Sequence, residues 1–163
     1  MGTKEYLASL PKKRMGAGAL IFNSKGQLLI ERVTYKADCE IPGGVIEENE
    51  SPREACEREI REELGIDMKV RKLLCVDYQH ATQEKTESIM FVFDGGILTD
   101  EMIAKIKIDK AEISEVVFAN PDEAISFLRT HGADTHPVSR RVEQALKALK
   151  SGVPVYLENR EII

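Results

Sequence analysis

The chain has 163 residues, of which 42% are hydrophobic and 31% charged, and its formal net charge is −5. This length and balance suit one globular domain with its own core. The negative charge argues against broad binding to a nucleic acid polymer or an anionic membrane, because basic surfaces supply most of that affinity. The sequence shows no membrane-spanning apolar run and no signal-peptide pattern, so we expect a cytoplasmic protein.

The first expected elements are two strands. Residues 15–22 form an apolar run typical of a buried strand, and residues 27–33 form a second run. The intervening Asn-Ser-Lys-Gly suits a tight turn, so we expect the two strands to pair as a hairpin. A loop over residues 34–39 then leads into residues 40–46.

The clearest helix signal comes next. Ser51 suits the N-cap, Pro52 suits the first helical position, and Glu54 completes a capping box. The helix should run to about Leu64, and Gly65 suits the left-handed residue that ends it. Apolar side chains that repeat every four residues predict its buried stripe, at Cys56, Ile60 and Leu64.

Strands and helices are mixed in the rest of the chain. The apolar patterns predict three further strands, at residues 68–79, 88–93 and 113–119. They predict three further helices, at residues 100–106, 121–130 and 138–151. This order favours an α/β domain in which helices pack on a mixed sheet.

The helix predicted to end at about Leu64 carries an acidic face. Glu59, Glu62 and Glu63 stand at positions i, i+3 and i+4, so their carboxylates share one side. A solvated face is the ordinary interpretation, but Glu63 lies close in angle to the buried stripe. The helix also follows a glycine pair whose backbone carbonyls can point at an ion. Because Mg²⁺ accepts clustered carboxylates, carbonyls and water, this pattern favours a metal site.

The segment from Gly44 to Ile66 resembles the signature of the Nudix (MutT-like) hydrolase superfamily. That signature is G-x5-E-x7-R-E-U-x-E-E-x-G-U, where U is a bulky aliphatic residue. Every defined position is filled, by Gly44, Glu50, Arg58, Glu59, Ile60, Glu62, Glu63, Gly65 and Ile66. The lead-in at residues 41–43 and the strand order over residues 14–125 are also similar to the family.

The resemblance implies an α/β/α sandwich, a mixed β-sheet flanked by helices. It implies one domain over residues 1–163. Residues 1–13 would be an N-terminal extension, residues 14–125 the core, and residues 138–163 a C-terminal helix and tail.

The resemblance also implies residue roles. Glu59, Glu62 and Glu63 would ligate one to three Mg²⁺ ions, or Mn²⁺ as a substitute, together with the carbonyl of Gly43. Arg58 would orient one of these carboxylates, most directly Glu59. Three further signature residues would support the loop and helix structurally: Gly44, Glu50 and Gly65.

In this family, water attacks a phosphorus of a nucleoside diphosphate linked to another moiety. The implied catalytic residues are Arg58, Glu59, Glu62 and Glu112. Glu59 is one candidate for the general base, and many members use a glutamate outside the signature. Glu112 fits that position best and Glu115 second, although a plain surface glutamate is an equal alternative for both.

Residues outside the signature are candidates for substrate binding. Arg32 can reach a phosphate, and Tyr35 and Tyr78 can stack on a base. The ordinary alternatives are a surface ion pair for the arginine and packing for the tyrosines. We expect a small nucleotide-type diphosphate as the partner, with no nucleic acid polymer and no membrane. The apolar tail at residues 153–157 can pack on its own domain or on a second chain, as in a homodimer.

Two other functions remain as alternatives. A non-catalytic nucleotide-ligand sensor on the same fold is the first, although a pure binder does not need three metal-facing carboxylates. An isomerase of an isoprenoid diphosphate would need its own catalytic cysteine, for which Cys39 and Cys56 lie in unsuitable contexts. With Cys75 they form an odd, widely spaced set that indicates reduced thiols. The signature does not identify the substrate.

Overall fold

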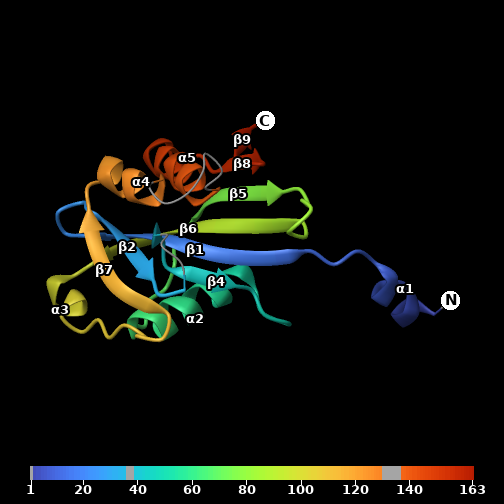
Figure 1. Cartoon of the computed structure of the whole chain (residues 1–163), viewed down its shortest axis with the longest axis horizontal. Coiled ribbons are helices and arrows are strands. Elements are labelled where there is room, and N and C mark those ends of the chain that lie inside the picture. Colours follow the sequence, from blue (N-terminus) through green and yellow to red (C-terminus); the bar gives the residue numbers. More distant parts are fainter. Residues whose placement is uncertain (1, 36–38, 130–136) are drawn as a thin grey trace.

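A mixed β-sheet lies between two layers of helices (Figure 1). The computed structural model describes residues 2–35, 39–129 and 137–163. On one face of the sheet lie α2 (Pro52–Leu64) and α3 (Asp100–Ile103). On the other lie α4 (Pro121–Arg129) and α5 (Pro137–Ser151). The expected α/β/α arrangement is confirmed.

The described strands form one sheet in the order β3-β2-β1-β6-β5-β8-β9, with β4 paired to β1 and β7 paired to β2. Their bounds, in chain order, are β1 (Arg14–Asn23), β2 (Leu28–Val33), β3 (Cys39–Glu40), β4 (Gly43–Val45), β5 (Leu73–Gln79), β6 (Ser88–Leu98), β7 (Ile113–Ala119), β8 (Val155–Glu158) and β9 (Glu161–Ile162). The β1–β2 pair is antiparallel, so the expected hairpin is confirmed.

Strand β1 has two partners along the edge that faces away from β6. Near its end, Phe22 pairs with Leu28 of β2. In its first half, Gly18 and Ala17 pair with Gly43 and Gly44 of β4. Because β4 leads into α2, this pairing holds the glycine pair against the sheet on the side of the helix.

The buried stripe of α2 sets the rotation of this helix. Cys56, Ile60 and Leu64 are all fully buried and pack against β1 and the loop after α2. Full burial of a large aliphatic side chain contributes about 1.5–3 kcal/mol. Turning the helix would therefore expose this stripe at high cost, and the neighbouring glutamates keep a fixed direction.

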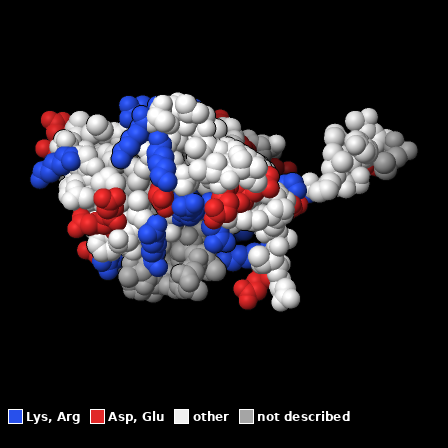
Figure 2. Space-filling model, turned by 90° about the horizontal axis from the view of Figure 1, so that it is seen from above, with Lys and Arg blue, Asp and Glu red and all other residues white. Residues whose placement is uncertain are grey.

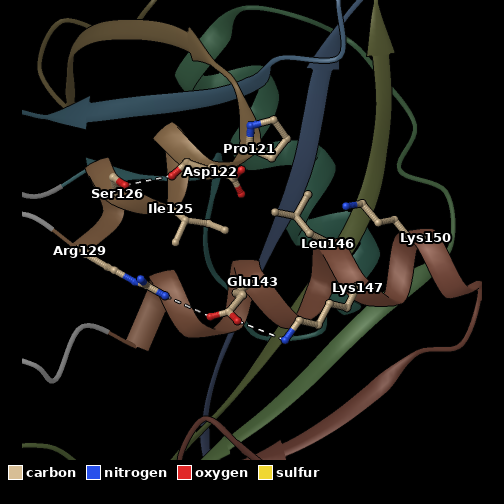
Figure 3. Close-up of a pocket in the computed structure, with 9 residues that line it drawn as sticks. All are labelled: Pro121, Asp122, Ile125, Ser126, Arg129, Glu143, Leu146, Lys147 and Lys150. Atoms are coloured by element: carbon tan, nitrogen blue, oxygen red, sulfur yellow. Dashed lines mark hydrogen bonds and ion pairs between the residues drawn. The ribbon is translucent and has the colours of Figure 1, made fainter.

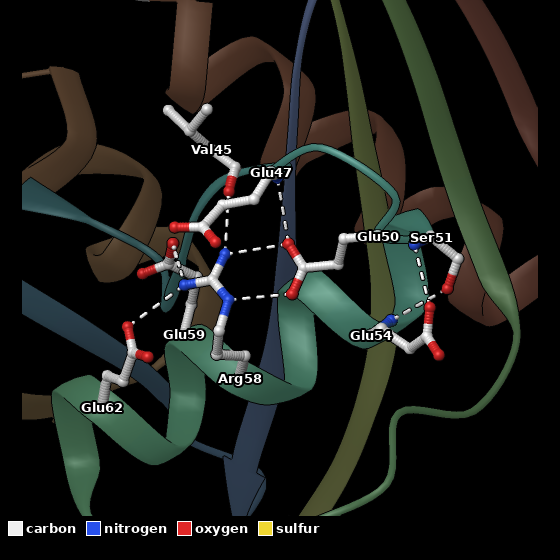
Figure 4. A network of polar contacts seen from close by, with 8 residues as sticks. All are labelled: Val45, Glu47, Glu50, Ser51, Glu54, Arg58, Glu59 and Glu62. Atoms are coloured by element: carbon white, nitrogen blue, oxygen red, sulfur yellow. Dashed lines mark hydrogen bonds and ion pairs between the residues drawn. The ribbon is translucent and has the colours of Figure 1, made fainter.

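Both ends of α2 follow the sequence-based expectation. The Ser51 side chain accepts a hydrogen bond from the Glu54 amide at 3.2 Å, and the Glu54 carboxylate accepts one from the Ser51 amide at 2.9 Å (Figure 4). Gly65 ends the helix with φ +67°, and its amide bonds Arg61 O at 2.9 Å. The capping box and the glycine stop are confirmed.

Two expected strand boundaries are wrong. Strand β5 starts at Leu73 rather than at residue 68, because the segment before it turns to pack against α2 and buries Val70. Only its last two residues, Arg71 and Lys72, exchange backbone hydrogen bonds with Asp94 of β6. Strand β6 runs to Leu98 rather than to residue 93. The Asp94 carboxylate accepts a hydrogen bond from the Gly96 amide at 2.9 Å, and a bulge lets the ladder continue through the glycines.

Other boundaries shift less. Helix α3 ends at Ile103 rather than at residue 106, and α4 ends at Arg129, beyond which the expected residue 130 lies outside the described part. The segment 40–46 contributes two short strands, β3 and β4. Of the loop expected at residues 34–39, residues 36–38 lie outside the described chain.

Both ends of the chain contain elements that the sequence patterns did not predict. Helix α1 (Thr3–Ser9) buries none of its residues and projects away from the sheet (Figures 1 and 2). At the other end, β8 adds to β5 in parallel. A buried ion pair between Asp77 and Arg141 at 2.9 Å and a hydrogen bond from the Arg160 amide to Asp77 anchor this region. The tail therefore packs on its own sheet.

All three cysteines are buried and unbonded to one another, as expected for reduced thiols. Among the helices of residues 2–35, 39–129 and 137–163, none is long and apolar enough to span a bilayer.

Candidate active site

Arg58 of α2 connects the helix to the loop that precedes it (Figure 4). Its Nε and Nη2 donate to the two carboxylate oxygens of Glu50 at 2.8 and 3.0 Å. Its Nη1 donates to Glu59 at 2.9 Å and to Glu62 at 3.1 Å, and Nη2 also donates to Val45 O at 3.0 Å. The planar guanidinium thus holds three carboxylates and one carbonyl in a fixed arrangement.

Glu50 is the strongest partner of this arginine. Hydrogen bonds from the Arg58 guanidinium, assisted by the Glu47 amide at 3.0 Å, lower the pKa of Glu50 to about 2. Glu50 is therefore ionised at neutral pH. Its role is to fix the arginine, which leaves the other side of the guanidinium to position Glu59 and Glu62.

The glycine pair of β4 makes room for the acidic face. A Cβ on Gly44 would lie 2.4 Å from Cδ of Glu59, so the Glu59 carboxylate rests directly on the Gly44 backbone. A Cβ on Gly43 would lie 2.2 Å from Ala17 O, and Gly43 has φ +143°. The Gly43 amide donates to Oε2 of Glu63 at 2.9 Å. These contacts explain why glycine is needed at both positions.

The three glutamates of the acidic face lie in different surroundings. The Glu62 side chain is 58% exposed, that of Glu59 is 15% exposed, and Glu63 as a whole is 7% exposed. The pKa of Glu63 is raised to about 8, mainly by burial and also by the charges of Glu59, Glu112 and Glu40, while the hydrogen bond from the Gly43 amide opposes the rise. Burial also raises the pKa of Glu59, while Arg58 opposes the change.

Glu112 lies close to these carboxylates although it is distant in sequence. Its charge raises the pKa of both Glu59 and Glu63. It immediately precedes β7, and its carbonyl accepts a hydrogen bond from the Thr34 amide at 2.8 Å, which ties it to the end of β2. The other outside candidate, Glu115, instead pairs with Arg32. The fold therefore brings Glu112, and not Glu115, to the acidic face.

Glu31 of β2 was not identified by the sequence analysis. It is 1% exposed, and neither carboxylate oxygen has a hydrogen-bond partner among the described residues. Burial raises its pKa well above the ordinary value, and the charges of Glu63, Glu40 and Glu59 add to this effect. The alternation with buried Leu29 and Val33 was the available signal, since it assigns Glu31 to an inward-facing position.

Two of the candidates for substrate binding, Arg32 and Tyr35, lie at or just beyond the end of β2. Arg32 forms an exposed ion pair with Glu115 at 3.1 Å, which matches the ordinary alternative. Tyr35 is 68% exposed just before residues 36–38.

Tyr78 lies on β5, which β6 separates from β1. Its hydroxyl bonds Glu87, its ring meets His80 edge-on at 4.9 Å between centroids, and the Lys13 amine lies 5.6 Å from the ring centre. These contacts are those of a residue packed at the margin of the sheet, so they match the alternative of packing rather than base stacking.

The chemistry of the donor set fits a hard divalent cation. Glu59, Glu62, Glu63 and Glu112 supply only oxygen ligands, and the buried Glu31 carboxylate lacks a hydrogen-bond partner. Among the described residues, however, no group of three such side chains is already arranged around a metal position. Glu59 and Glu62 are turned toward Arg58, and Glu63 toward the Gly43 amide. Binding a cation would require these carboxylates to rotate.

A second candidate region is a groove of about 450 Å³ between α4 and α5, on the opposite face of the sheet (Figure 3). Its cations are partly neutralised, because Glu143 pairs with Arg129 and Lys147 at 3.2 Å each. Figure 2, seen from this side, shows basic and acidic side chains interleaved. The groove lacks the clustered carboxylates of the α2 face.

Comparison with known proteins agrees with the geometry of the α2 face. A family model described as the NUDIX domain matches residues 12–142. The crystal structure of the MutT protein from Methanosarcina mazei Go1 has a TM-score of 0.66 with 27% sequence identity, and the match covers 85% of this chain and 99% of that one.

Two curated relatives match shorter segments. The first is 8-oxo-dGDP phosphatase NUDT18 of Danio rerio, 46% identical over 66 aligned positions, in a match that covers 38% of this chain and 20% of that protein. The second is an RNA pyrophosphohydrolase of Gluconacetobacter diazotrophicus, 39% identical over 72 aligned positions, in a match that covers 39% of this chain and 42% of the relative. The matched segments span less than half the length of these relatives.

Proposed function

Because the chain belongs to the Nudix family, we propose that it is a metal-dependent hydrolase that cleaves the diphosphate linkage of a nucleoside diphosphate joined to another moiety. The observation that carries the proposal is the acidic face of α2. There Arg58 holds Glu59 and Glu62 beside the buried Glu63, directly above a glycine pair. Three glutamates and a single arginine leave this face with excess negative charge, which a bound cation would neutralise.

In the proposed site, Glu59, Glu62 and Glu63 hold Mg²⁺, or Mn²⁺ in its place, with the Gly43 carbonyl as a further ligand. When bound, the cation would neutralise the negative charge of the diphosphate and lower the pKa of a water molecule on the metal. The protein's part is to position these ligands. Arg58 and Glu50 support Glu59 from the loop side, and Gly44 leaves the space that the Glu59 carboxylate fills.

Two carboxylates are candidates for the general base that takes a proton from the attacking water. The raised pKa of Glu59 suits a base, but its oxygen is bound to Arg58. Glu112 is exposed and close enough to influence both Glu59 and Glu63. We assign the role to Glu112. The variant Glu112→Gln should then lower kcat by 10²–10⁴-fold and leave metal affinity unchanged. A loss of metal affinity instead would make Glu112 a ligand.

The names of the relatives guide the choice of substrates. One relative is named for a nucleoside diphosphate and the other for RNA. A test panel should contain nucleoside di- and triphosphates, including 8-oxo-dGDP, together with nucleotide sugars, dinucleotides and an RNA oligonucleotide with a 5′-triphosphate. The net charge of −5 favours the small substrates over the RNA.

The experiment screens this panel in the presence of Mg²⁺ and measures released inorganic phosphate. A second assay adds a phosphatase, so that nucleotide products of the hydrolysis also release phosphate. We expect turnover of at least one small nucleotide and none in excess EDTA. Tight binding of a nucleotide without turnover of any compound would instead support the sensor. Turnover that persists in EDTA would rule out the metal-dependent reaction.

A further inference from the structure

Glu31 differs from every other buried carboxylate in the described part of the chain. Five carboxylate side chains are buried: Glu31, Glu57, Glu63, Asp77 and Asp94. Each of the other four accepts at least one hydrogen bond, from a backbone amide, a lysine or an arginine. Neither oxygen of Glu31 accepts any. A buried carboxylate without a donor is costly, so its presence calls for a compensating group.

The strand geometry directs Glu31 toward the acidic face of α2. Successive side chains of a strand point to opposite faces, so Glu31 shares its face with Leu29. Leu29 belongs to the core cluster beneath α2, whereas Leu28 and Ile30 belong to the cluster on the other side. Glu31 therefore enters the space under α2 from the sheet.

The immediate surroundings of Glu31 are acidic. Its register partner on β3 is Glu40, and its partner on β7 is Val116. Glu63 and Glu59 approach from α2 closely enough for their charges to act on it. No ion pair of the described residues joins Glu31 to a lysine or arginine. Within the described residues, this leaves a bound cation or a proton shared with Glu63 as the compensating group.

We propose that Glu31 is a further ligand of the metal ion, binding it from β2 on the sheet side while the α2 glutamates bind it from the helix side. This inference rests on the proposed metal-dependent function and adds a residue outside the signature. A cation between Glu31 and Glu63 satisfies both buried carboxylates at once. It also explains why β2 carries an acid at a position where its neighbours on the same face are apolar.

Glu57 provides a matched control. It is also a buried glutamate, 5% exposed, and lies on α2. Unlike Glu31, it is fully engaged in structural contacts, since it accepts from Lys69 Nζ at 2.6 Å and from the Val70 amide at 3.2 Å. The same Glu-to-Gln change should therefore have opposite consequences at the two positions.

The experiment measures Mn²⁺ binding to metal-stripped protein by calorimetry, without substrate, together with the melting temperature in EDTA. For Glu31→Gln we expect Mn²⁺ affinity at least tenfold below wild type, and a melting temperature in EDTA that is unchanged or higher. For Glu57→Gln we expect a lower melting temperature in EDTA and Mn²⁺ affinity within twofold of wild type. Glu31→Met should reproduce the Glu31→Gln pattern.

The inference is overturned if Glu31→Gln binds Mn²⁺ as tightly as wild type, if wild type binds no Mn²⁺, or if Glu31→Gln is unfolded in EDTA. The last result would mean that Glu31 stabilises the metal-free fold. Hydrolysis by the wild type is measured separately. Unaltered Mn²⁺ affinity in Glu31→Gln, with intact wild-type turnover, would remove Glu31 from the site and leave the proposed function standing.

Discussion

Arg58 and Glu50 form a two-pronged ion pair, in which Nε and Nη2 of the guanidinium donate to the two carboxylate oxygens at 2.8 and 3.0 Å. The pair joins the middle of α2 to the loop after β4 and leaves Nη1 for Glu59 and Glu62. Arg58, held by Glu50, thus controls the direction of two residues proposed to bind metal.

The first prediction concerns this pair. Glu50→Gln removes the charge and one acceptor, so the guanidinium loses its fixed orientation, and we expect kcat to fall by about 10–100-fold. Arg58→Lys should do the same, because an ammonium cannot bond two carboxylate oxygens and a third acceptor in one plane. Steady-state kinetics on the best substrate of the panel measures both changes.

Glu54→Gln is the control for the Glu50 change. Glu54 lies in the same segment, and its carboxylate caps the helix by accepting from the Ser51 amide, a role that glutamine also fills. Its turnover should match wild type. Equal losses in Glu50→Gln and Glu54→Gln would show that the effect comes from a weakened helix start rather than from Arg58.

The second prediction concerns Gly44. An alanine Cβ there would lie 2.4–2.7 Å from the Glu59 carboxyl atoms, which can move because they end a flexible side chain. We therefore expect Gly44→Ala to leave the melting temperature nearly unchanged but to lower kcat and Mn²⁺ affinity by about tenfold or more. Wild-type kinetics in this variant would show that Glu59 does not need its observed position.

Gly26→Ala separates local strain from loss of the site. Gly26 has φ +75° in the β1–β2 turn, and a Cβ there meets nothing within 4 Å. This variant should lose about 1 kcal/mol of stability, measured by urea unfolding, because alanine is strained at positive φ. Its kcat should stay at the wild-type value, so the two glycine variants should show opposite effects.

The third prediction concerns pH in the absence of metal. Burial raises the pKa of Glu63 from 4.5 to about 8, so the folded protein holds this proton more tightly than the unfolded chain does. The contribution of this bound proton to the free energy of unfolding is fully present below about pH 4.5 and is lost as pH rises through about 8. Melting temperatures in EDTA should therefore fall between pH 5 and pH 8, and Mn²⁺ should reverse the loss. Glu63→Gln should flatten the curve, and a curve of wild-type steepness would contradict the burial of Glu63 as its cause.

Local signals predicted α2 well. Ser51, Glu54 and Gly65 have short-range roles that a few neighbouring residues determine, and the periodic apolar stripe required only helix geometry. The same pattern predicted that Glu63 lies at the edge of the core, and the structure buries it. The start of β5 and the end of β6 were missed because they depend on contacts elsewhere in the fold. Residues 68–70 pack against α2 before the β5–β6 pairing begins, and a bulge carries β6 past Gly96.

The sequence also showed only part of the site. The signature indicated the residues on α2 and in the preceding loop, but proximity across the fold was needed for the others. Glu112 was the first candidate and Glu115 the second, but a plain surface glutamate was an equal alternative for both. The register of β7 with β2 pairs Glu115 with Arg32, whereas the charge of Glu112 acts on Glu59 and Glu63. Glu31 looked like an ordinary strand residue, because the acidic neighbours that make it unusual come from β3 and α2.

The central claim is that the α2 carboxylates support a metal-dependent cleavage of a diphosphate. Its most direct test is the rate of nucleotide hydrolysis by wild type and by the double variant Glu62→Gln, Glu63→Gln, with Mg²⁺ and in excess EDTA, after circular dichroism has shown both proteins to be folded. We expect Mg²⁺-dependent turnover by the wild type and none above background for the double variant. Turnover that survives the double change, or that continues in EDTA, would contradict it.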